Sequence, residues 1–327
     1  MHVEMSDGKR NRRGDNKGER RREISILQQL VLWLISTVKS FSKEAKAHLV
    51  LSDTEMFRTS ILLAILATLA STSPLQERAS VATTWWKPAP LTRWQIVLDS
   101  SGSITIHPDI LVYDIDLFDT PQSTISALHK AGKKVICYIS AGTYENWRPD
   151  ASQFPPSALG NAVDGWAGER WVDTRSTAVR NIMTQRIALA SSKSCDGIDP
   201  DNLDGYDNDD GLGLTETNSI NYVSFLASAA HAKGLAIGLK NCPEIVPNVI
   251  SQVDWSVTEE CAKYDECNSY QPFISAKKPV FQIEYPNVAS VASIQSVCKK
   301  SHSTFSTLIK KLALDEWYTT CSNIVAA

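Results

Sequence analysis

The sequence predicts an α/β protein with a TIM-type (β/α)8 barrel, formed by one domain that follows an N-terminal segment of different character. Two observations support this prediction. From Trp85 onward, short apolar runs rich in β-branched residues alternate with longer amphipathic runs, as in a parallel sheet covered by helices. The alternation repeats eight times over about 240 residues, which is the length of a typical barrel of this kind.

The predicted strands are short, apolar and evenly spaced along the domain. They are Trp94–Leu98, Leu111–Ile115, Val135–Ser140, Arg170–Asp173, Gly197–Asp201, Leu235–Lys240, Trp255–Glu259 and Val280–Glu284. A ninth run, Thr307–Lys310, has the same character. Because a barrel of this type has eight strands, the ninth run indicates that one assignment is wrong.

The predicted helices lie between these strands and carry amphipathic patterns. They are Thr120–Ala131, Thr177–Ser192, Thr215–Lys233 and Ala289–Lys299. The first and third are followed by Gly132 and Gly234, which suit the left-handed conformation that commonly ends a helix.

The chain divides into three segments. Residues 1–55 are basic and predicted to be disordered, or to precede the true start of translation. Residues 56–84 hold a signal peptide and a short linker: a methionine, one arginine, an apolar run and small residues follow one another over about residues 56–73. Residues 85–327 form the barrel domain. Since a targeting signal normally stands first, we expect translation to begin at Met56 and the product to be secreted.

A membrane alternative exists for the same N-terminal segment. Residues 24–38 and 60–69 could form two membrane-associated helices, but both runs are shorter than the roughly 20 apolar residues that a spanning helix needs. The prediction is therefore that the protein meets a membrane only through its signal peptide.

Charge is unevenly distributed along the chain. Residues 1–55 carry 11 Lys and Arg against 8 Asp and Glu, whereas the remainder carries 22 against 28. An acidic body argues against a nucleic-acid partner. The nine Trp and nine Tyr suit stacking on sugar rings, although they are equally consistent with ordinary packing.

The seven cysteines all lie in the barrel domain, at spacings unlike those of a paired zinc site. In a secreted protein they favour disulfides. Cys261 with Cys267 and Cys298 with Cys321 are the predicted pairs. Because the count is odd, one thiol remains, and Cys137, inside an apolar run, is the predicted buried free cysteine.

Polar residues end nearly every predicted strand. In a closed parallel barrel the carboxyl ends of the strands meet at one rim, where such barrels hold their chemistry. Helix capping explains any single one of these residues, but so many together favour a site. The strand-end residues are Asp114, Asp116, Ser140, Gly142, Asp173, Asp199, Asp201, Lys240, Asn241, Glu259, Glu284 and Tyr285.

The densest acidic segment is Asp196-Gly-Ile-Asp-Pro-Asp-Asn-Leu-Asp204. Crowded carboxylates repel one another and separate their pKa values, as an acid and a base working together require. Asp201 and Glu259 end strands two positions apart, so we predict that they form the carboxylate pair of a glycosidase, with Asp199 as the alternative to Asp201.

A metal site is the main chemical alternative for the acidic segment. Asp199 and Asp201 have the offset of a calcium loop, but the next ligand position is Leu203. No pair of histidines with the zinc-protease spacing occurs in the sequence. We therefore predict neither a metal nor another cofactor.

These residues also resemble glycoside hydrolase family 114, the endo-α-1,4-polygalactosaminidases, known mostly from fungi and bacteria. The likeness extends from about Trp85 to Cys321. It rests on the blocks Trp85-Trp-Lys-Pro88, Val112-Tyr-Asp-Ile-Asp-Leu-Phe-Asp119, Val135-Ile-Cys-Tyr-Ile-Ser-Ala-Gly142, Glu145-Asn-Trp-Arg-Pro-Asp150, Asp196-Gly-Ile-Asp-Pro-Asp-Asn-Leu-Asp-Gly205, Gly238-Leu-Lys-Asn241 and Phe281-Gln-Ile-Glu-Tyr285.

The resemblance implies a barrel fold and endo-hydrolysis of α-1,4-linked galactosamine polymers by an acidic pair that matches Asp201 and Glu259. A polycationic polysaccharide is the implied substrate. We also expect the enzyme to be a monomer, and the signal-like sequence at about residues 56–73 predicts that it is secreted. The residues expected to bind or orient the sugar are Asp114, Asp116, Tyr138, Asp199, Asn202, Asp204, Lys240, Asn241, Glu284 and Tyr285.

The sequence leaves open the effect of Glu260 and the separate roles of Asp201 and Glu259. Glu260 stands where the family pattern has a neutral Gln, so its carboxylate either raises the pKa of Glu259 or points to solvent. We expect Glu259 to be the general acid/base and Asp201 the nucleophile or base, but the two roles can be exchanged. The alternative functions are a sugar-binding or cell-wall protein without turnover and a glycosidase for another aminosugar linkage.

Overall fold

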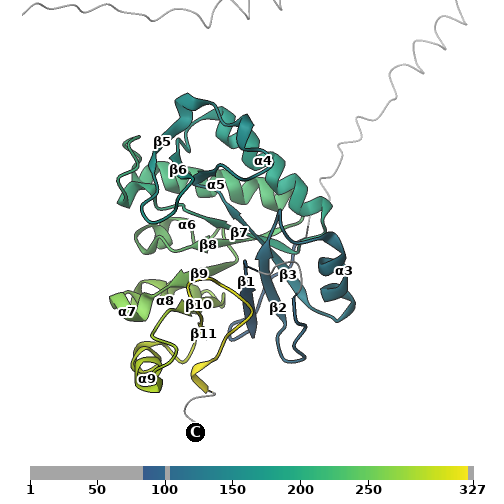
Figure 1. The fold of residues 1–327 in the computed structure, drawn as a ribbon, viewed down its shortest axis with the longest axis vertical. Coiled ribbons are helices and arrows are strands. Elements are labelled where there is room, and N and C mark those ends of the chain that lie inside the picture. The colour runs from purple at the N-terminus through teal and green to yellow at the C-terminus, as the bar shows by residue number, and fades with distance from the viewer. Residues whose placement is uncertain (1–83, 100–103, 323–327) are drawn as a thin grey trace, which may run out of the picture. The chain divides into compact units, whose positions relative to one another are not determined.

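The structure is a computed structural model that describes residues 84–99 and 104–322. Its centre is one eight-stranded parallel sheet that curls into a nearly closed barrel, with helices on the outside (Figure 1). In spatial order the strands are β1 (Trp94–Val97), β2 (Val112–Asp116), β3 (Lys134–Ser140), β7 (Gly197–Asp201), β8 (Ala236–Lys240), β9 (Trp255–Glu259), β10 (Val280–Glu284) and β11 (Ser306–Ile309).

The helices connect successive strands of the barrel and cover it. They are α3 (Gln122–Lys130), α4 (Thr177–Ser192), α5 (Glu216–Ala232), α6 (Val246–Val249), α7 (Cys261–Tyr264), α8 (Gln271–Ser275) and α9 (Val291–Lys300). Helix α5 shows how the sequence sets such an element: Thr215 caps its first turn reciprocally with Asn218, and Gly234, at φ 72°, follows its end. The glycine stop predicted there is confirmed.

The barrel closes through side chains and a C-terminal segment. Within the described residues no backbone ladder joins β1 to β11. Instead, Trp94 Nε1 donates to the carbonyl oxygen of Ser306 at 2.8 Å. The backbone nitrogen of Leu98 donates to the carbonyl oxygen of Leu314 at 3.0 Å. The segment that follows β11 therefore fills the seam beside the mouth of the barrel.

The inside of the barrel is filled by aromatic side chains at its amino-terminal end. Trp94, Trp255 and Phe281 are fully buried in one cluster. A Cβ at Gly238 would lie 2.3 Å from Trp255 Nε1, so only glycine leaves room for this indole. Because the bottom of the barrel is solid, the polar side chains gather at the opposite end.

Seven of the eight predicted barrel strands are confirmed, and the other one is replaced by the ninth run. Arg170–Asp173 is not a barrel strand: β6 (Glu169–Val172) pairs antiparallel with β4 (Thr143–Glu145) and β5 (Leu159–Ala162) in a separate three-stranded sheet inserted between β3 and α4. The eighth barrel strand is instead β11, the supposed extra run Thr307–Lys310. A short apolar run fits either kind of pairing, so its pattern alone could not separate the two.

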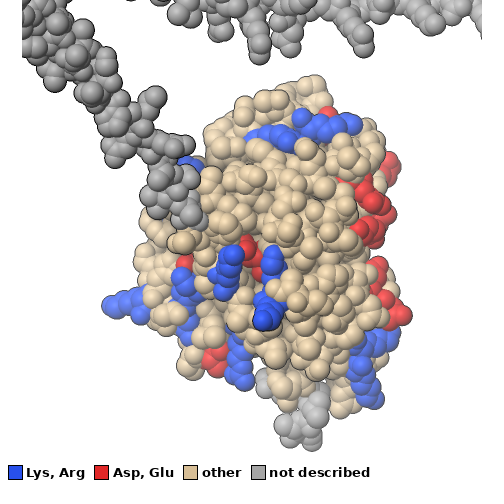
Figure 2. Space-filling view, turned by 180° about the vertical axis from the view of Figure 1, so that it is seen from behind, with Lys and Arg blue, Asp and Glu red and all other residues tan. Residues whose placement is uncertain are grey.

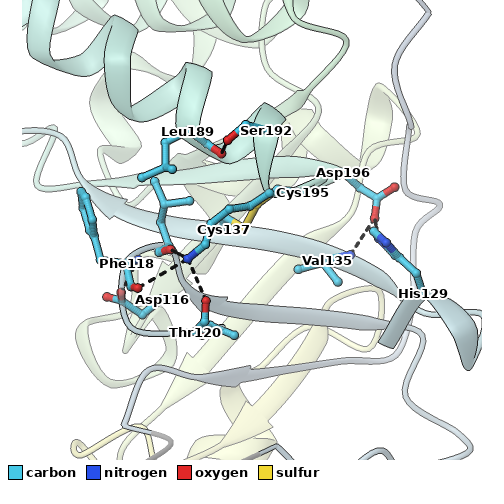
Figure 3. The surroundings of a disulfide bond; sticks show 12 residues. Asp116, Phe118, Thr120, His129, Val135, Cys137, Leu189, Ser192, Cys195 and Asp196 are labelled. Carbon is cyan, nitrogen blue, oxygen red and sulfur yellow. Dashed lines mark hydrogen bonds and ion pairs between the residues drawn. A yellow bond between two sulfur atoms is a disulfide. The ribbon is translucent and has the colours of Figure 1, made fainter. Parts of the chain in front are cut away.

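Three disulfides join six of the cysteines, and two of them are the predicted pairs, Cys261–Cys267 and Cys298–Cys321. The prediction of a free Cys137 is wrong, because Cys137 bonds to Cys195 and the buried free thiol is Cys242. Figure 3 shows this bond between β3 and the start of β7. The two strands are neighbours in the sheet, although the bonded residues stand 58 positions apart in sequence.

Two further findings concern the surface and the helices. Figure 2 shows one face of the molecule, on which Lys and Arg side chains surround a small acidic patch while other acidic side chains gather at one edge. No helix in the described part of the chain is long and apolar enough to cross a membrane. The predicted signal peptide at about residues 56–73 lies outside the described residues.

Candidate active site

Three neighbouring strands, β7, β8 and β9, end in Asp201, Lys240 and Glu259. The residue that follows each of these has a left-handed backbone, with φ values of 60°, 52° and 55°. Such a residue turns the chain away at once, so the last side chain of each strand stays at the mouth of the barrel. Asparagine tolerates this conformation at 202 and 241, whereas Glu260 adopts it at a cost.

Lys240 lies between the two predicted carboxylates and contacts both. Its Nζ atom is 3.1 Å from Asp201 Oδ1 and 3.1 Å from Glu259 Oε2, and its side chain is only 2% exposed. Burial alone would lower the pKa of this ammonium group, but the two carboxylates raise it well above its ordinary value. A permanent positive charge therefore holds Asp201 and Glu259 together.

A tyrosine hydroxyl reaches the other oxygen of each carboxylate. Tyr138 donates to Asp201 Oδ2 at 3.0 Å, and Tyr285 donates to Glu259 Oε1. Burial, followed by the charge of the adjacent carboxylate, raises the pKa of both tyrosines well above the ordinary value. Both phenols therefore stay protonated and act as hydrogen-bond donors at neutral pH.

Glu259 is kept ionised by these contacts. Burial opposes its charge, but Lys240 and the hydrogen bond from Tyr285 lower its pKa below the ordinary value. Asn241 contributes as well, because its Nδ2 atom donates to Glu259 Oε2 at 3.2 Å and its Oδ1 atom accepts from the Glu259 backbone. Glu260 forms an ion pair with Lys263 at 2.8 Å. The pKa of Glu259 is thus lowered even though a second carboxylate follows it in the chain.

The turn after Asp201 packs closely on the end of β3. A Cβ at Gly142 would lie 1.5 Å from the carbonyl oxygen of Asn202, so this contact requires glycine. Asn202 Nδ2 also donates to Ser140 Oγ at 3.0 Å. This packing fixes the position of the Asp201 strand end.

A second pair of acids, Asp114 and Asp199, lies inside the barrel and is fully buried. No donor elsewhere in the described part of the chain reaches their four carboxyl oxygens. The hydrogen bond between the two therefore needs a proton on one of them. Burial raises the pKa of both acids, and the charge of Asp199 raises that of Asp114 further. Burial, with the charges of Asp201 and Glu259 and against that of Lys240, raises the pKa of Asp199 to about 7. Neither acid lines the cleft above.

The cleft is a cavity of about 400 Å³ that has Asp201 and Glu259 in its wall. Its opposite wall comes from β2 and from the inserted sheet. There the buried Arg148 holds Asp116 at 2.6 Å and Glu145 at 2.8 Å. Two tryptophans on the same side, Trp147 and Trp166, are 51% and 54% exposed. The cleft thus combines carboxylates with flat apolar surfaces.

Most of the predicted binding residues line this cleft, namely Asp116, Tyr138, Asn202, Asp204, Lys240, Asn241 and Tyr285. Glu284 does not, which corrects its expected role: it is fully buried and accepts hydrogen bonds from Gln282 Nε2 and the Ala262 backbone, both at 2.8 Å. The side chain at the end of β10 faces outward, under α7, and the next residue, Tyr285, faces the cleft instead.

Sequence reasoning missed the residues that the inserted sheet and the C-terminal segment bring to the cleft. These are Glu145, Trp147, Arg148, Trp166, Glu169 and residues 312–314, and the loop after β2 adds Asp119. Glu145, Trp147 and Arg148 belong to a sequence block that resembles the family but contains no predicted site residue. Assigning residues 170–173 to the barrel hid Glu169, since a strand start in a barrel faces away from the mouth.

One group of potential metal ligands exists within the residues that the structure describes. Side-chain atoms of Cys261, Cys267 and Glu284 lie within 4.8 Å of one another. The two cysteines form a disulfide, however, and a metal site requires thiolates.

Comparison with known proteins identifies the family. The profile of Glycoside-hydrolase family GH114 matches residues 75–326. The chain is similar to Aspergillus fumigatus Ega3, whose crystal structure is a complex with galactosamine: identity is 47%, the TM-score is 0.70, and the match covers 73% of this chain and 98% of that one.

Two other similarities are more distant. The glycoside hydrolase domain of PelA from Pseudomonas aeruginosa has a TM-score of 0.55 at 13% identity, over 69% of this chain and 97% of that one, which shows a shared fold. An uncharacterised protein of Deinococcus radiodurans is 24% identical over 69% of this chain and 88% of its own length. On the family match, the chain belongs to glycoside hydrolase family GH114 and is a glycosidase.

Proposed function

We propose that the protein is a secreted, endo-acting hydrolase that cleaves α-1,4-linked galactosamine-containing polysaccharide with Asp201 and Glu259. The observation that carries this proposal is the contact of both carboxylates with Lys240 at the floor of an open cleft. Such a pair can protonate a leaving glycosidic oxygen and attack or stabilise the sugar that remains. The similarity to a protein crystallised with galactosamine supports the choice of sugar.

We assign the roles from the charge state of the pair. A nucleophile must be ionised at the working pH, and Lys240 and Tyr285 hold the pKa of Glu259 below its ordinary value. Glu259 is therefore the proposed nucleophile and Asp201 the acid/base. This is the exchange of the roles first expected from the sequence.

The shared lysine also bears on stereochemistry. Since Asp201 Oδ1 and Glu259 Oε2 both lie 3.1 Å from one Nζ atom, these two oxygens are at most twice that distance apart. Inverting glycosidases separate their carboxyl groups by about 6.5–9.5 Å to admit a water molecule, whereas retaining enzymes need about 5–5.5 Å. The bound holds for the two oxygens that contact Lys240, and on it we propose retention through a glycosyl–Glu259 intermediate.

The charge of the cleft suits a polycationic polymer. Eight carboxylates line it, those of Asp99, Asp116, Asp119, Glu145, Glu169, Asp201, Asp204 and Glu259, against the two cations Arg148 and Lys240. A negative cleft attracts a polymer that carries protonated amino groups.

Secretion is part of the proposal and rests on the cysteines and the N-terminal sequence. Three disulfides are typical of a protein that folds in an oxidising compartment. The signal-like sequence at about residues 56–73 supplies a route there. We propose that residues 85–327 are the secreted monomeric enzyme.

Hydrolysis of purified α-1,4-galactosamine polymer, partly and fully deacetylated, tests the proposal. Oligomers should appear early with the wild type, as endo-cleavage requires, and should be absent with Asp201→Asn and Glu259→Gln. If the wild type binds the polymer without releasing oligomers, the protein is a sugar-binding protein. If it cleaves only another aminosugar polymer, the proposed linkage is wrong.

A further inference from the structure

Positive charge gathers at the amino-terminal face of the barrel, opposite the cleft. Each barrel strand begins at this face, and the helix before it ends there. Three acids lie just before strands at the same face, and each contacts a cation or a histidine: Asp109, Asp196 and Asp254. The exposed cations that precede or begin barrel strands, or end helices, are Lys87, Arg93, Lys130, Lys134, Lys233, Lys277, Lys299 and Lys300.

Most of these cations have no acidic partner. Arg93 pairs with Asp109 at 3.0 Å and Lys134 with Asp196 at 2.6 Å, whereas no ion pair among the described residues involves the other six. The dipole of a helix favours Lys in its last turn, as at Lys130, but it does not account for cations beside the strands. The face therefore carries a net positive charge. Figure 2 shows Lys and Arg side chains gathered around a small acidic patch on one face of the molecule.

The two ends of the barrel thus carry opposite charge. Carboxylates outnumber cations around the cleft, which suits a polycation, whereas the amino-terminal face suits a polyanion. Lys supplies a compact charge on a flexible stem, and all but one of the exposed cations on this face are Lys. Such a set fits a chain of repeated anionic groups better than a single bound anion.

A cavity of about 520 Å³ opens on this face, between the starts of β1 and β11 and the end of α9. Its wall includes Arg93, His302, Ser303, Tyr318 and Thr320. Arg93 uses only its Nη1 atom for Asp109, so its Nε and Nη2 atoms have no partner within the described part of the chain. Hydroxyl groups, an aromatic ring and a guanidinium group suit an anionic sugar unit. A flat anionic surface such as a membrane would not reach into this cavity.

We propose that the amino-terminal face binds an anionic polysaccharide, one that carries uronate or phosphate groups, with one sugar unit in the cavity beside Arg93. The extracellular setting of this partner rests on the proposed function. Because the face lies opposite the cleft, the protein can hold the anionic polymer and cleave a cationic one at the same time.

Removal of three unpaired cations tests the proposal. Lys130→Gln, Lys233→Gln and Lys277→Gln, combined in one chain, change exposed side chains from three different parts of the face. We expect the Kd for polygalacturonate, measured by calorimetry at low ionic strength, to rise by about 10-fold or more. The difference should shrink as salt is added, because at about 1 M the Debye length falls to about 3 Å. Phosphomannan in the same titration distinguishes phosphate groups from uronates as the bound anion.

The matched control removes the same charge from the opposite end of the barrel. Arg175→Gln, Lys263→Gln and Lys311→Gln change three exposed cations at the carboxyl end. This second triple variant should bind polygalacturonate as tightly as the wild type. All variants keep residues 1–55, so the basic residues of that segment contribute equally.

Arg93→Gln tests the cavity by itself. A galacturonate trisaccharide is too short to span the face, so its binding should depend on the cavity and weaken by about 10-fold in this variant. Folding should be preserved, because the exposed ion pair with Asp109 contributes little to stability.

Four outcomes overturn the inference. They are no binding of either anionic polymer by the wild type, the same Kd in the two triple variants, trisaccharide binding unaffected by Arg93→Gln, and binding of phosphatidylserine vesicles as tight as that of polygalacturonate. None of these measurements requires cleavage of galactosamine polymer, so they stand or fall separately from the proposed function. The amino-face variant should release galactosamine oligomers at the wild-type rate.

Discussion

The acids at the two ends of the same barrel strands differ in their contacts: those at the amino end join strands, whereas those at the carboxyl end line the cleft. Strand β7 is preceded by Asp196 and ends in Asp201, and β9 is preceded by Asp254 and ends in Glu259. At the amino-terminal end, Asp196 contacts His129 at 2.8 Å and accepts a hydrogen bond from the Val135 backbone (Figure 3). Asp196 also contacts Lys134 at 2.6 Å.

Asp254 repeats this arrangement two strands away. It contacts His231 at 3.1 Å, and it accepts hydrogen bonds from Trp85 Nε1 at 3.0 Å and from the Ile237 backbone at 3.1 Å. Both amino-terminal acids thus tie a strand to its neighbour through the backbone. The acids at the other end share one lysine, bond to tyrosines and face a cavity. The contacts of each acid, and not its residue type, therefore determine whether it stabilises the fold or takes part in the proposed chemistry.

The largest effect should come from Lys240→Met, which removes the charge between the carboxyl-end acids. Two carboxylates left on the cleft floor repel each other, so one of them takes up a proton near neutral pH. We expect kcat/KM to fall by about 100-fold or more, with the acid limb of the pH–rate profile moved to higher pH. A pH–rate profile of the variant measures both changes.

The matched control for that variant is Lys278→Met at the other end. Lys278 Nζ donates to the carbonyl oxygens of Ile250 and Val253 before β9, both at 2.5 Å. The Lys278→Met variant should be less stable than the wild type but keep the wild-type kcat/KM and pH–rate profile. A similar fall in activity for the two lysine variants would mean that Lys240 only supports the fold.

Removal of the amino-end disulfide should affect stability alone. Replacing Cys137 and Cys195 with Ser is expected to lower the free energy of unfolding by about 2–5 kcal/mol, because the unfolded chain regains the freedom of a long loop. Denaturant titration gives the change, and kcat/KM of the folded fraction should match the wild type. Reduced kcat/KM in the folded protein would show that this end also shapes the cleft.

A smaller loss of stability is expected for Asp254→Asn. The amide still has one oxygen that accepts, but the charge opposite His231 is lost, together with the hydrogen bond from Trp85 Nε1 or the one from the Ile237 backbone, at a cost of about 1–3 kcal/mol. Thermal unfolding should show the loss, and polymer cleavage should continue at the wild-type rate. A stability equal to that of the wild type would remove Asp254 from the comparison.

The smallest effect concerns the buried pair Asp114 and Asp199. Because burial raises the pKa of Asp199 to about 7, the folded protein binds a proton there that the unfolded chain has lost. Stability from this source is present below about pH 4 and is lost as the pH rises through 7. Asp199→Asn should flatten that decline, since its amide replaces the shared proton as donor. A slope of unfolding free energy against pH equal to that of the wild type would contradict the shared proton.

The sequence predicted the barrel and the strand ends that meet at its rim, because hydrophobic alternation and strand-end chemistry are local patterns. It could not place side chains by face. Asp199 and Asp201 are two residues apart on one strand, so both side chains point into the barrel, at different depths. The sequence alone does not show which of the two lines the cleft. Glu284 faces away from the barrel, whereas Tyr285 does not.

The sequence also could not predict which segments far apart in the chain pair with each other. The inserted sheet brings Glu169 to the cleft, and the spacing of apolar residues says nothing about an insertion that folds back over the rim. Cys137 and Cys195 meet because β3 and β7 are neighbours in the sheet. The insertion separates these strands in the sequence and so hides the proximity of the two cysteines. The Cys261–Cys267 pair, by contrast, is separated by 6 positions and could be predicted from proximity.

The most direct test of the central claim compares Asp201→Asn with Asp196→Asn, the same substitution at the two ends of β7. We expect release of galactosamine oligomers to fall by about 1,000-fold in Asp201→Asn, which should fold as stably as the wild type. Asp196→Asn should cleave at the wild-type rate and unfold at a lower temperature. Equal activity in the two variants, or full activity in Asp201→Asn, would contradict the assignment of the chemistry to the carboxyl end of the barrel.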